Sequence, residues 1–283
     1  MINYVKQIQL SIDDIESKLD EELDLDAIAA SANFSKFHYH RIFHAMVGEP
    51  VMEYVRKRRL IKAARELMRT DKKVIDIALS SGFNSHETFS RAFKKFFGIA
   101  PMRCRKNKIS LDDLENSAAI KNLKGGIIMQ PKFLKKDGFM VVGLECVTTV
   151  KENKENKIIP KLWDKFLPRM AEIKNHSDCP VCYGVCSCDN PGDAFSYISG
   201  IEVKSLDAIP KGMAGRKVAP SKYAVFTHHG PTNRIYETLD YIYGTWLPAS
   251  GCELNKLSCD FELYDERFNG GENSEFDIYI PIK

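Results

Sequence analysis

LDAIAASANFSKFHYHRIFHAMVGEP, at residues 25–50, recurs with substitutions as VIDIALSSGFNSHETFSRAFKKFFGIAP at residues 74–101. Matching positions lie 49 residues apart at Phe34 and Phe83, and 50 residues apart at Ser35 and Ser85. One extra residue in the turn accounts for this shift. Because an internal repeat indicates architecture more firmly than local propensity does, we expect one supersecondary unit to occur twice here.

Each copy is predicted to form a short helix, a tight turn and a second helix. The first helices should end near Asn33 and Gly82, and Ser35 and Ser85 are placed to cap the second helices by accepting a backbone N–H. Between the copies, residues 51–68 have helical periodicity and predict a linker helix that fixes their spacing. Apolar residues at helical spacing predict one buried stripe on each second helix: Tyr39, Ile42, Phe43 and Met46, and Phe89, Ala92, Phe93 and Phe96.

The charge of the chain is unevenly distributed. Residues 34–108 contain 18 Lys and Arg against 6 Asp and Glu, a net charge of +12, whereas residues 109–283 contain 21 against 24, a net charge of −3. Residues 1–33 are acidic and predict a flanking helix. A basic segment that contains two helix-turn-helix units favours double-stranded DNA as the partner.

The second helix of a helix-turn-helix unit lies in the major groove, and its first two turns face the bases. Arg can bind guanine, Glu can accept from cytosine, and an aromatic ring or His can touch a thymine methyl. An alternative is that Arg41 and Arg91, which are equivalent in the repeat, contact phosphates or acidic neighbours only. The basic run at residues 56–59 also favours phosphate contacts, with a solvated face as its alternative. The predicted contact residues are Phe37, His40 and Arg41 in the first copy, His86, Glu87, Ser90 and Arg91 in the second, and Lys94 and Lys95 for phosphates.

The second copy, AxxxGFxSxETFSRAFKKFFGIAPMRCRK, closely resembles the signature of the AraC/XylS family of regulators, and the resemblance covers about residues 8–108. It implies that the two recognition helices enter successive major-groove segments on one face of an asymmetric site. Phe37 stands where several members carry tryptophan, and His40 where glutamine is common. The sequence of the first half-site therefore does not carry over from the family.

A second repeat follows a charged and then Gly-rich linker at residues 109–128. We expect two domains: an all-α double helix-turn-helix domain at residues 1–108 and an α+β domain at residues 129–283. In the second domain, duplicated strand-helix-strand-strand units should form an antiparallel sheet, with helices on one side and a ligand cleft where the halves meet. The expected elements are strand 138–147, helix 158–174, strands 181–188 and 195–203, then strand 222–228, helix 232–246, and strands 258–264 and 276–282.

Aromatic residues and one glutamate are the candidates for the cleft. Phe261 and Leu263 should lie on one face of their strand, and Glu262 and Tyr264 on the other. A carboxylate on an inward face is costly unless it has partners, and near aromatic rings it favours an apolar cation. The alternative is an exposed glutamate paired with a nearby lysine. The candidate effector-binding residues are Glu262, Trp163, Phe166, Tyr183, Tyr197, Tyr243, Trp246 and Tyr264.

The strings YGVCSCDN, FSYISGIEV, KYAVFTHHGP, IYGTWLPASG, FELYDERF and DIYIPIK resemble the gyrase-inhibitor-like (GyrI-like) effector-binding domain, from about residue 131 to residue 283. The resemblance implies that Glu262, in FELY, lies in a ligand cleft walled by aromatic residues. Several members respond to amphipathic cations, and some free-standing relatives are hydrolases of strained small molecules. We expect this part of the chain to have the fold of the family. The residues that wall the cleft vary in the family, and the ligand varies with them.

Four cysteines, Cys179, Cys182, Cys186 and Cys188, form a cluster just after His176. Such spacing can build a zinc site or a thiol switch. However, Cys182, Cys186 and Cys188 share one face of a strand, and no second C-x2-C completes a zinc ribbon. We therefore favour small buried thiols and assign no metal and no cofactor, with metal binding and redox sensing as alternatives.

These features predict a ligand-responsive transcription regulator, not an enzyme, with DNA, a small-molecule effector and RNA polymerase as partners. The alternatives are a cleft that hydrolyses or sequesters toxic compounds, with Glu262 as general base, and a metal or thiol sensor. No apolar run approaches the ~18 residues that span a bilayer. The N-terminus is too acidic for a signal peptide, so we expect a cytoplasmic protein without membrane contact.

Overall fold

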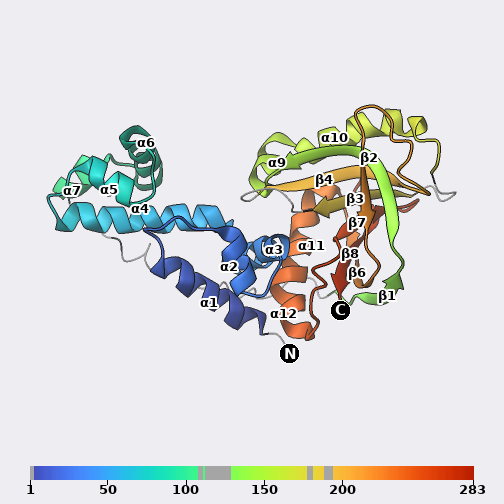
Figure 1. Cartoon of the computed structure of the whole chain (residues 1–283), viewed down its shortest axis with the longest axis horizontal. Coiled ribbons are helices and arrows are strands. Elements are labelled where there is room, and N and C mark those ends of the chain that lie inside the picture. Colours follow the sequence, from blue (N-terminus) through green and yellow to red (C-terminus); the bar gives the residue numbers. More distant parts are fainter. Residues whose placement is uncertain (1–2, 108–110, 112–128, 177–180, 188–193) are drawn as a thin grey trace. The chain divides into compact units, whose positions relative to one another are not determined.

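The computed structural model describes residues 3–107, 111, 129–176, 181–187 and 194–283. The chain divides into two compact units, a helical unit that begins at Tyr4 and a sheet-containing unit that ends at Lys283 (Figure 1). An all-α region followed by an α+β region is the predicted fold class, which is confirmed. Within the described residues, no helix is both long enough and apolar enough to cross a membrane.

The helical unit contains the two predicted copies, α2–α3 and α5–α6, and the long helix α4 between them (Figure 1). The helix α4 packs against α3 of the first copy and against α5 and α6 of the second. It is therefore the predicted linker helix. The bounds are α1 Tyr4–Ser17, α2 Leu25–Ser31, α3 Lys36–Val47, α4 Val51–Arg69, α5 Val74–Ser80, α6 His86–Phe97 and α7 Pro101–Asn107.

The turns of the two copies match in backbone conformation and hydrogen bonding. Asn33 and Gly82 occupy the same turn position and both have left-handed φ values, 59° and 74°. Asn and Gly are the residues that tolerate this conformation best. Asn84 is the extra residue of the second turn. The hydrogen bonds that close the turns are equivalent: Phe34 N–H to the Ala29 carbonyl at 2.9 Å, and Phe83 N–H to the Ala78 carbonyl at 3.1 Å.

The predicted helix caps are also present in both copies. The Ser35 hydroxyl accepts from the backbone N–H of residue 38, and the Ser85 hydroxyl from that of residue 88. Each second helix then ends at a glycine in the left-handed conformation, Gly48 and Gly98. Short-range signals thus fix both ends of α3 and α6.

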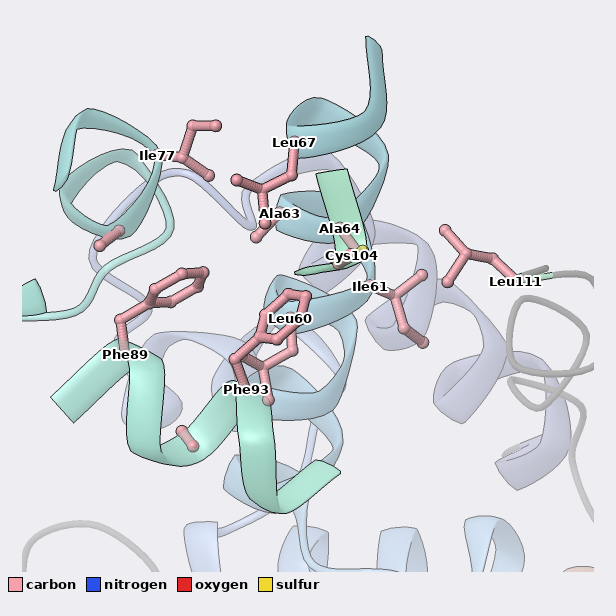
Figure 2. Packing of buried hydrophobic residues seen from close by; sticks show 12 residues of the cluster. Leu60, Ile61, Ala63, Ala64, Leu67, Ile77, Phe89, Phe93, Cys104 and Leu111 are labelled. Carbon is pink, nitrogen blue, oxygen red and sulfur yellow. The ribbon is translucent and has the colours of Figure 1, made fainter. Parts of the chain in front are cut away.

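The core of the second copy forms between α4, α5 and α6 (Figure 2). Phe89 and Phe93 of α6 are fully buried and lie against Leu60 and Leu67 of α4. Ile77 of α5 closes the same cluster. Because these buried side chains anchor α6 along its length, the opposite face of the helix is exposed to solvent.

The sheet-containing unit has eight strands in the order β1-β6-β8-β7-β3-β4-β2-β5, and all pairs are antiparallel. The helices predicted at 158–174 and 232–246 are present, whereas α9 was not predicted, and the helix of the second half contains a π-helical turn, η4. The bounds are β1 Lys132–Lys136, β2 Phe139–Thr148, α9 Val150–Asn156, α10 Ile158–Phe166, η2 Leu167–Glu172, β3 Cys182–Ser187, β4 Phe195–Val203, β5 Ala214–Val218, β6 Ser221–His229, η3 Thr232–Arg234, α11 Ile235–Tyr241, η4 Ile242–Trp246, α12 Leu247–Ser250, β7 Phe261–Tyr264 and β8 Glu275–Ile282.

The predicted duplication of a strand-helix-strand-strand unit is confirmed, as β2-α10-β3-β4 and β6-α11-β7-β8. The strands β1 and β5 were not predicted. Both form an edge of the sheet, and each pairs with the opposite half: β1 with β6, and β5 with β2. Their sequences, KFLKK and AGRKV, are rich in charge, as edge strands commonly are, and lack apolar alternation.

The two faces of the sheet differ. On the helix-covered face, Val142 and Ile201 pack against Phe166 of α10, and Phe226 packs against Trp246 of η4. The opposite face carries an aromatic core of its own around Tyr183, Tyr223, Phe261 and Tyr279. Strand alternation therefore assigns each side chain to the helix-covered face or to this second core.

Candidate functional site

The helix α6 presents a polar face to solvent. His86, Glu87 and Arg91 are exposed, as are Lys94 and Lys95, while Ser90 is half-buried. A hydrogen bond from its own backbone N–H, and then one from Ser85, lowers the pKa of the Glu87 carboxyl, so this side chain is an ionised acceptor. Hydrogen-bonding and cationic groups are thus displayed along one face of the helix, where the repeat predicted them.

The corresponding face of α3 is less open than predicted. Phe37, expected to face solvent, is only 9% exposed, and that expectation was wrong. Its ring lies 5.5 Å from the ring of His38, and the Arg41 guanidinium lies over it at 5.0 Å from the ring centre. His40 and Arg41 are half-buried. An aromatic side chain gains more from such ring and cation contacts than from water, which explains its position.

The basic run at residues 56–59 is mostly engaged inside the helical unit, and phosphate contacts by this run stay a prediction. Arg58 binds Glu16 of α1, at 2.9 Å from Nη2 to Oε2. Lys57 contacts Glu49, at 3.3 Å, and Lys62 of the next turn pairs with Asp20. Acidic residues from α1, from the segment after it and from the turn before α4 thus neutralise one side of α4, and within the run Arg56 is the exposed residue.

Glu262 lies at the centre of the sheet, on β7, directly opposite Gly184 of β3. Equivalent pairings relate the two halves: Ser199 of β4 faces Gly184, and Ile278 of β8 faces Glu262. Gly184 is therefore the counterpart of Glu262 in the first half, and the two face each other across the pseudo-twofold axis. Glu262 accordingly stands where the halves meet, and its counterpart Gly184 has no side chain.

Two tyrosine hydroxyls converge on this carboxylate. The Tyr197 hydroxyl donates to Oε2 of Glu262 at 2.6 Å, and the Tyr264 hydroxyl donates to the same oxygen at 3.0 Å. The indole Nε1–H of Trp163, on α10, donates to the Tyr197 hydroxyl at 3.1 Å. The ring of Trp163 also packs edge to face against Tyr264, at 5.2 Å. These four residues, contributed by α10, β4 and β7, form a single hydrogen-bonded group, called the Glu262 cluster below.

Burial raises the pKa of both tyrosines well above the usual value, and the neighbouring Glu262 charge raises it further. Tyr197 and Tyr264 therefore remain protonated donors. Glu262 itself is half-buried, as is Trp163. A carboxylate held by hydroxyl donors and flanked by aromatic rings offers a negative charge in a largely apolar setting, which suits an apolar cation.

Gly184 makes this arrangement possible. A Cβ at position 184 would overlap the Tyr197 hydroxyl and Oε2 of Glu262. The prediction did not include Gly184, although a glycine inside a strand is a known signal of close approach by another group. The sequence YGVC contained this signal.

The other four aromatic candidates lie outside the Glu262 cluster. Phe166, the last residue of α10, is fully buried in the core between this helix and the sheet. Tyr183 is on the opposite face of the sheet, where its hydroxyl donates to Glu202 at 2.9 Å. Because its strand neighbour Gly184 faces the helices, strand alternation turns Tyr183 away, so its expected place in the cleft was wrong.

The remaining two candidates belong to the second half of the sheet. Tyr243 is buried, and its hydroxyl donates to Oδ2 of Asp260 at 3.2 Å. Asp260 is 3% exposed, precedes Glu262 by two residues and was not predicted. Trp246 packs edge to face on Phe226 at 4.9 Å. Both aromatic residues help hold α11 and η4 on the sheet.

Of the cysteine cluster, the structure describes Cys182 and Cys186, whereas Cys179 and Cys188 lie outside the described residues. Cys182 and Cys186 are free thiols on the helix-covered face of β3. Four residues along a strand separate two side chains by ~13 Å, too far to share one metal ion. Burial raises the pKa of the Cys182 thiol, which disfavours the reactive thiolate. Among the described residues, no group of three or more His, Cys, Asp or Glu side chains is arranged to hold a metal.

Comparison with known families gives matches in both parts of the chain. A model described as an integron-associated effector binding protein matches residues 133–282. A model described as a helix-turn-helix domain matches residues 28–107. The first match runs from within β1 to the end of β8 and contains the Glu262 cluster, and the second contains α3 to α7.

Three curated relatives are similar to the chain. The transcriptional regulator BrlR of Pseudomonas aeruginosa is 38% identical over 156 residues, 54% of this chain and 56% of BrlR, so the chain spans little more than half of that relative. The right origin-binding protein of Escherichia coli is 27% identical over 286 residues, 95% of each chain. The HTH-type transcriptional activator AarP of Providencia stuartii is 42% identical over 100 residues, 35% of this chain and 74% of AarP.

Proposed function

We propose that this chain, which belongs to the family of integron-associated effector-binding proteins and carries an AraC-type helix-turn-helix domain, is a DNA-binding transcription regulator controlled by a small-molecule effector. Its partners on this proposal are double-stranded DNA, the effector and RNA polymerase, and it acts in the cytoplasm. The observation that carries the proposal is the exposed polar face of α6, combined with the half-buried carboxylate of Glu262 in a separate unit.

The DNA-binding role is supported by how α6 is held. Buried Phe89 and Phe93 fix the helix from behind, and its exposed face presents Arg91 and Glu87 at the positions that enter the major groove. Lys94 and Lys95 extend the same helix with two further cations, which suits phosphate contacts. The equivalent Arg41 of α3 is half-buried, so α6 is proposed as the stronger reader of bases.

Sequence selection followed by footprinting tests this role. In vitro selection from random duplexes with the full chain should return one defined sequence. Arg91→Ala should weaken binding to it by about 1–3 kcal/mol and relax the preference at one or two base pairs. Arg234→Ala removes an exposed arginine of the sheet-containing unit and is the matched control. Unchanged, equally selective binding by Arg91→Ala would refute base readout by Arg91.

The effector role is supported by the Glu262 cluster. Glu262 accepts from Tyr197 and Tyr264, and the Trp163 ring packs against Tyr264. Charge attraction and cation–π attraction act together there, so the proposed effector is an apolar or amphipathic cation. Relatives named as regulators favour binding over the hydrolytic role, and no observation favours the sensor or sequestration alternatives.

A thermal-shift screen tests the effector class, because a ligand that binds the folded state raises the melting temperature. Hydrophobic quaternary ammonium cations should stabilise the chain, and their neutral carbon isosteres should stabilise it less. Glu262→Gln keeps the size of the side chain and should remove most of the difference between cation and isostere. If neutral compounds stabilise the chain as well as cations do, the cationic effector is excluded.

Control of transcription further requires that the effector bind one conformational state better than another. We propose that effector binding at the Glu262 cluster changes DNA or polymerase engagement by the helical unit. Measuring DNA affinity with and without a stabilising cation checks this link. An unchanged affinity and unchanged transcription in vitro would leave the two units functionally independent and refute effector control.

A further inference from the structure

Arg59 of α4 is bonded to the segment that leads into the first helix-turn-helix copy. Its Nε donates to the Leu19 carbonyl at 2.8 Å, and its Nη2 donates to the Glu21 carbonyl at 2.6 Å. These two carbonyls lie between α1 and α2. A guanidinium group is planar, so two such bonds fix the orientation of the whole group.

The same guanidinium lies against the turn of the second copy. A Cβ built at Gly82 would be 2.5 Å from Nη1 of Arg59 and 2.9 Å from its Cζ. Gly82 is the turn residue between α5 and α6, with φ of 74°. The absence of a side chain at this position therefore does two things: it permits the turn, and it lets Arg59 approach the backbone. Removal from water lowers the pKa of Arg59, as expected for a group packed between two segments.

We propose that Arg59 is a positioning residue that fixes the segment leading into the first helix-turn-helix copy relative to the turn of the second copy, and so sets the spacing between the two DNA half-sites. This inference rests on the proposed DNA-binding function. Each added base pair rotates the next half-site by about 34° around the duplex, so a rigid pair of recognition helices discriminates sharply between spacings. A pair of recognition helices that is held less rigidly accepts several spacings.

The contacts of Arg59 separate this role from phosphate binding. Nε and Nη2 point to backbone carbonyls, and Nη1 faces Gly82. A residue that contacts phosphate contributes about one unit to the slope of log affinity against log salt concentration. A positioning residue contributes nothing to that slope.

Arg105 provides a matched control. Its Nε donates to the Leu67 carbonyl at 3.1 Å, and its Nη2 donates to the Lys72 carbonyl at 2.5 Å. The chemistry is that of Arg59, two backbone carbonyls bound by one guanidinium. However, Leu67 lies in the last turn of α4 and Lys72 in the connection to α5, so these two bonds of Arg105 do not involve the segment that leads into the first copy.

The experiment is in vitro selection with the full chain, read as the distribution of distances between the two half-sites. Wild type and Arg105→Ala should each return two half-sites at one dominant spacing. Arg59→Ala should return the same half-site sequences at several spacings, with the preference for the dominant spacing reduced by roughly fivefold or more. The salt slope of Arg59→Ala on the dominant site should equal that of wild type.

A second variant protects the test against misfolding of Arg59→Ala. The first copy has Asn33 at the position of Gly82, with φ of 59°, so Gly82→Asn keeps the turn while its side chain displaces the guanidinium. It should broaden the spacing as Arg59→Ala does. The double variant should be no broader than either single one, because both remove the same contact.

The outcomes are distinct. Failure of wild type to select any sequence refutes the proposed DNA-binding function itself. A bipartite site whose spacing stays sharp in both Arg59→Ala and Gly82→Asn refutes the positioning role. A salt slope smaller by about one unit in Arg59→Ala refutes it as well and makes Arg59 a phosphate contact.

Discussion

The Tyr197 hydroxyl donates to Oε2 of Glu262 at 2.6 Å while accepting from Nε1 of Trp163 at 3.1 Å. Tyr197 is 1% exposed. One hydroxyl thus connects the carboxylate on β7 to the indole on α10. Glu262 is a polar group inside a mostly apolar region, and its hydroxyl partners offset the cost of that position.

Tyr197→Phe should destabilise the protein more than Tyr264→Phe does. Removing the Tyr197 hydroxyl leaves both Glu262 and the Trp163 N–H without that partner, a cost of about 1–3 kcal/mol. Tyr264→Phe removes a single longer bond, at 3.0 Å, and should cost about 0.5–1.5 kcal/mol. Urea denaturation of both variants checks the order. Equal losses would mean that the Trp163 bond adds nothing.

Gly184→Ala should abolish effector binding, although it adds only one methyl group. The new Cβ overlaps the Tyr197 hydroxyl and Glu262, so the two side chains must separate. We expect a loss of stability in the range of overpacked cores, about 1–3 kcal/mol, and loss of the thermal shift with quaternary ammonium cations. Gly271→Ala is the control, because its Cβ meets only the Asn269 side chain, at 3.2 Å. Cation binding that survives Gly184→Ala would remove the effector site from the Glu262 cluster.

Sequence reasoning succeeded where structure depends on neighbours in the chain. The turns at Asn33 and Gly82, and the caps Ser35 and Ser85, involve partners within five residues, so the repeat was sufficient to place them. Alternation along β7 likewise placed Glu262 and Tyr264 on one face, which is confirmed by their hydrogen bond.

Prediction from the sequence failed where the residue that determines a side chain's environment is distant in the chain. Helical periodicity shows that Arg58 lies on a polar side of α4, but not that Glu16, 42 residues earlier, packs there. Tyr183 was predicted to lie in the cleft with the other tyrosines, but the strand register places it on the opposite face of the sheet. The edge strands β1 and β5 are defined by pairing with the other half of the sheet, for which their charged sequences contain no local signal.

The stability of the protein should fall as the pH drops below 6.5 because of His228. This side chain is 2% exposed and contacts Thr238, at 2.8 Å from Nδ1 to Oγ1. Burial lowers its pKa below the ordinary 6.5 in the folded protein. The unfolded chain therefore takes up the proton at higher pH than the folded chain does, so the stabilisation is complete above pH 6.5 and is lost as the pH falls toward the folded-state pKa.

Urea denaturation at pH 7.5, 6.5 and 5.5 measures this dependence. In His228→Gln, the fall in unfolding free energy between pH 6.5 and 5.5 should be shallower than in wild type, whatever the stability of the variant at pH 7.5. A steeper or identical fall in His228→Gln would show that protonation of His228 is not what destabilises the protein.

The salt dependence of DNA binding should separate the lysines of α6 from the basic residues of α4. Lys94 and Lys95 are exposed next to the predicted base contacts, whereas Lys57 and Arg58 are bound to Glu49 and Glu16. Counterion release depends on cations that reach phosphates, not on net charge alone. The double variant Lys94→Ala with Lys95→Ala should therefore lower the slope of log affinity against log salt concentration by about 2.

Replacing Lys57 and Arg58 by Gln removes the same charge and is the control. Because these two residues already have acidic partners, the replacement should leave the salt slope unchanged while lowering the melting temperature. If the two double variants lower the slope equally, the acidic partners of Lys57 and Arg58 do not keep these residues from DNA, and the 56–59 run contacts phosphates.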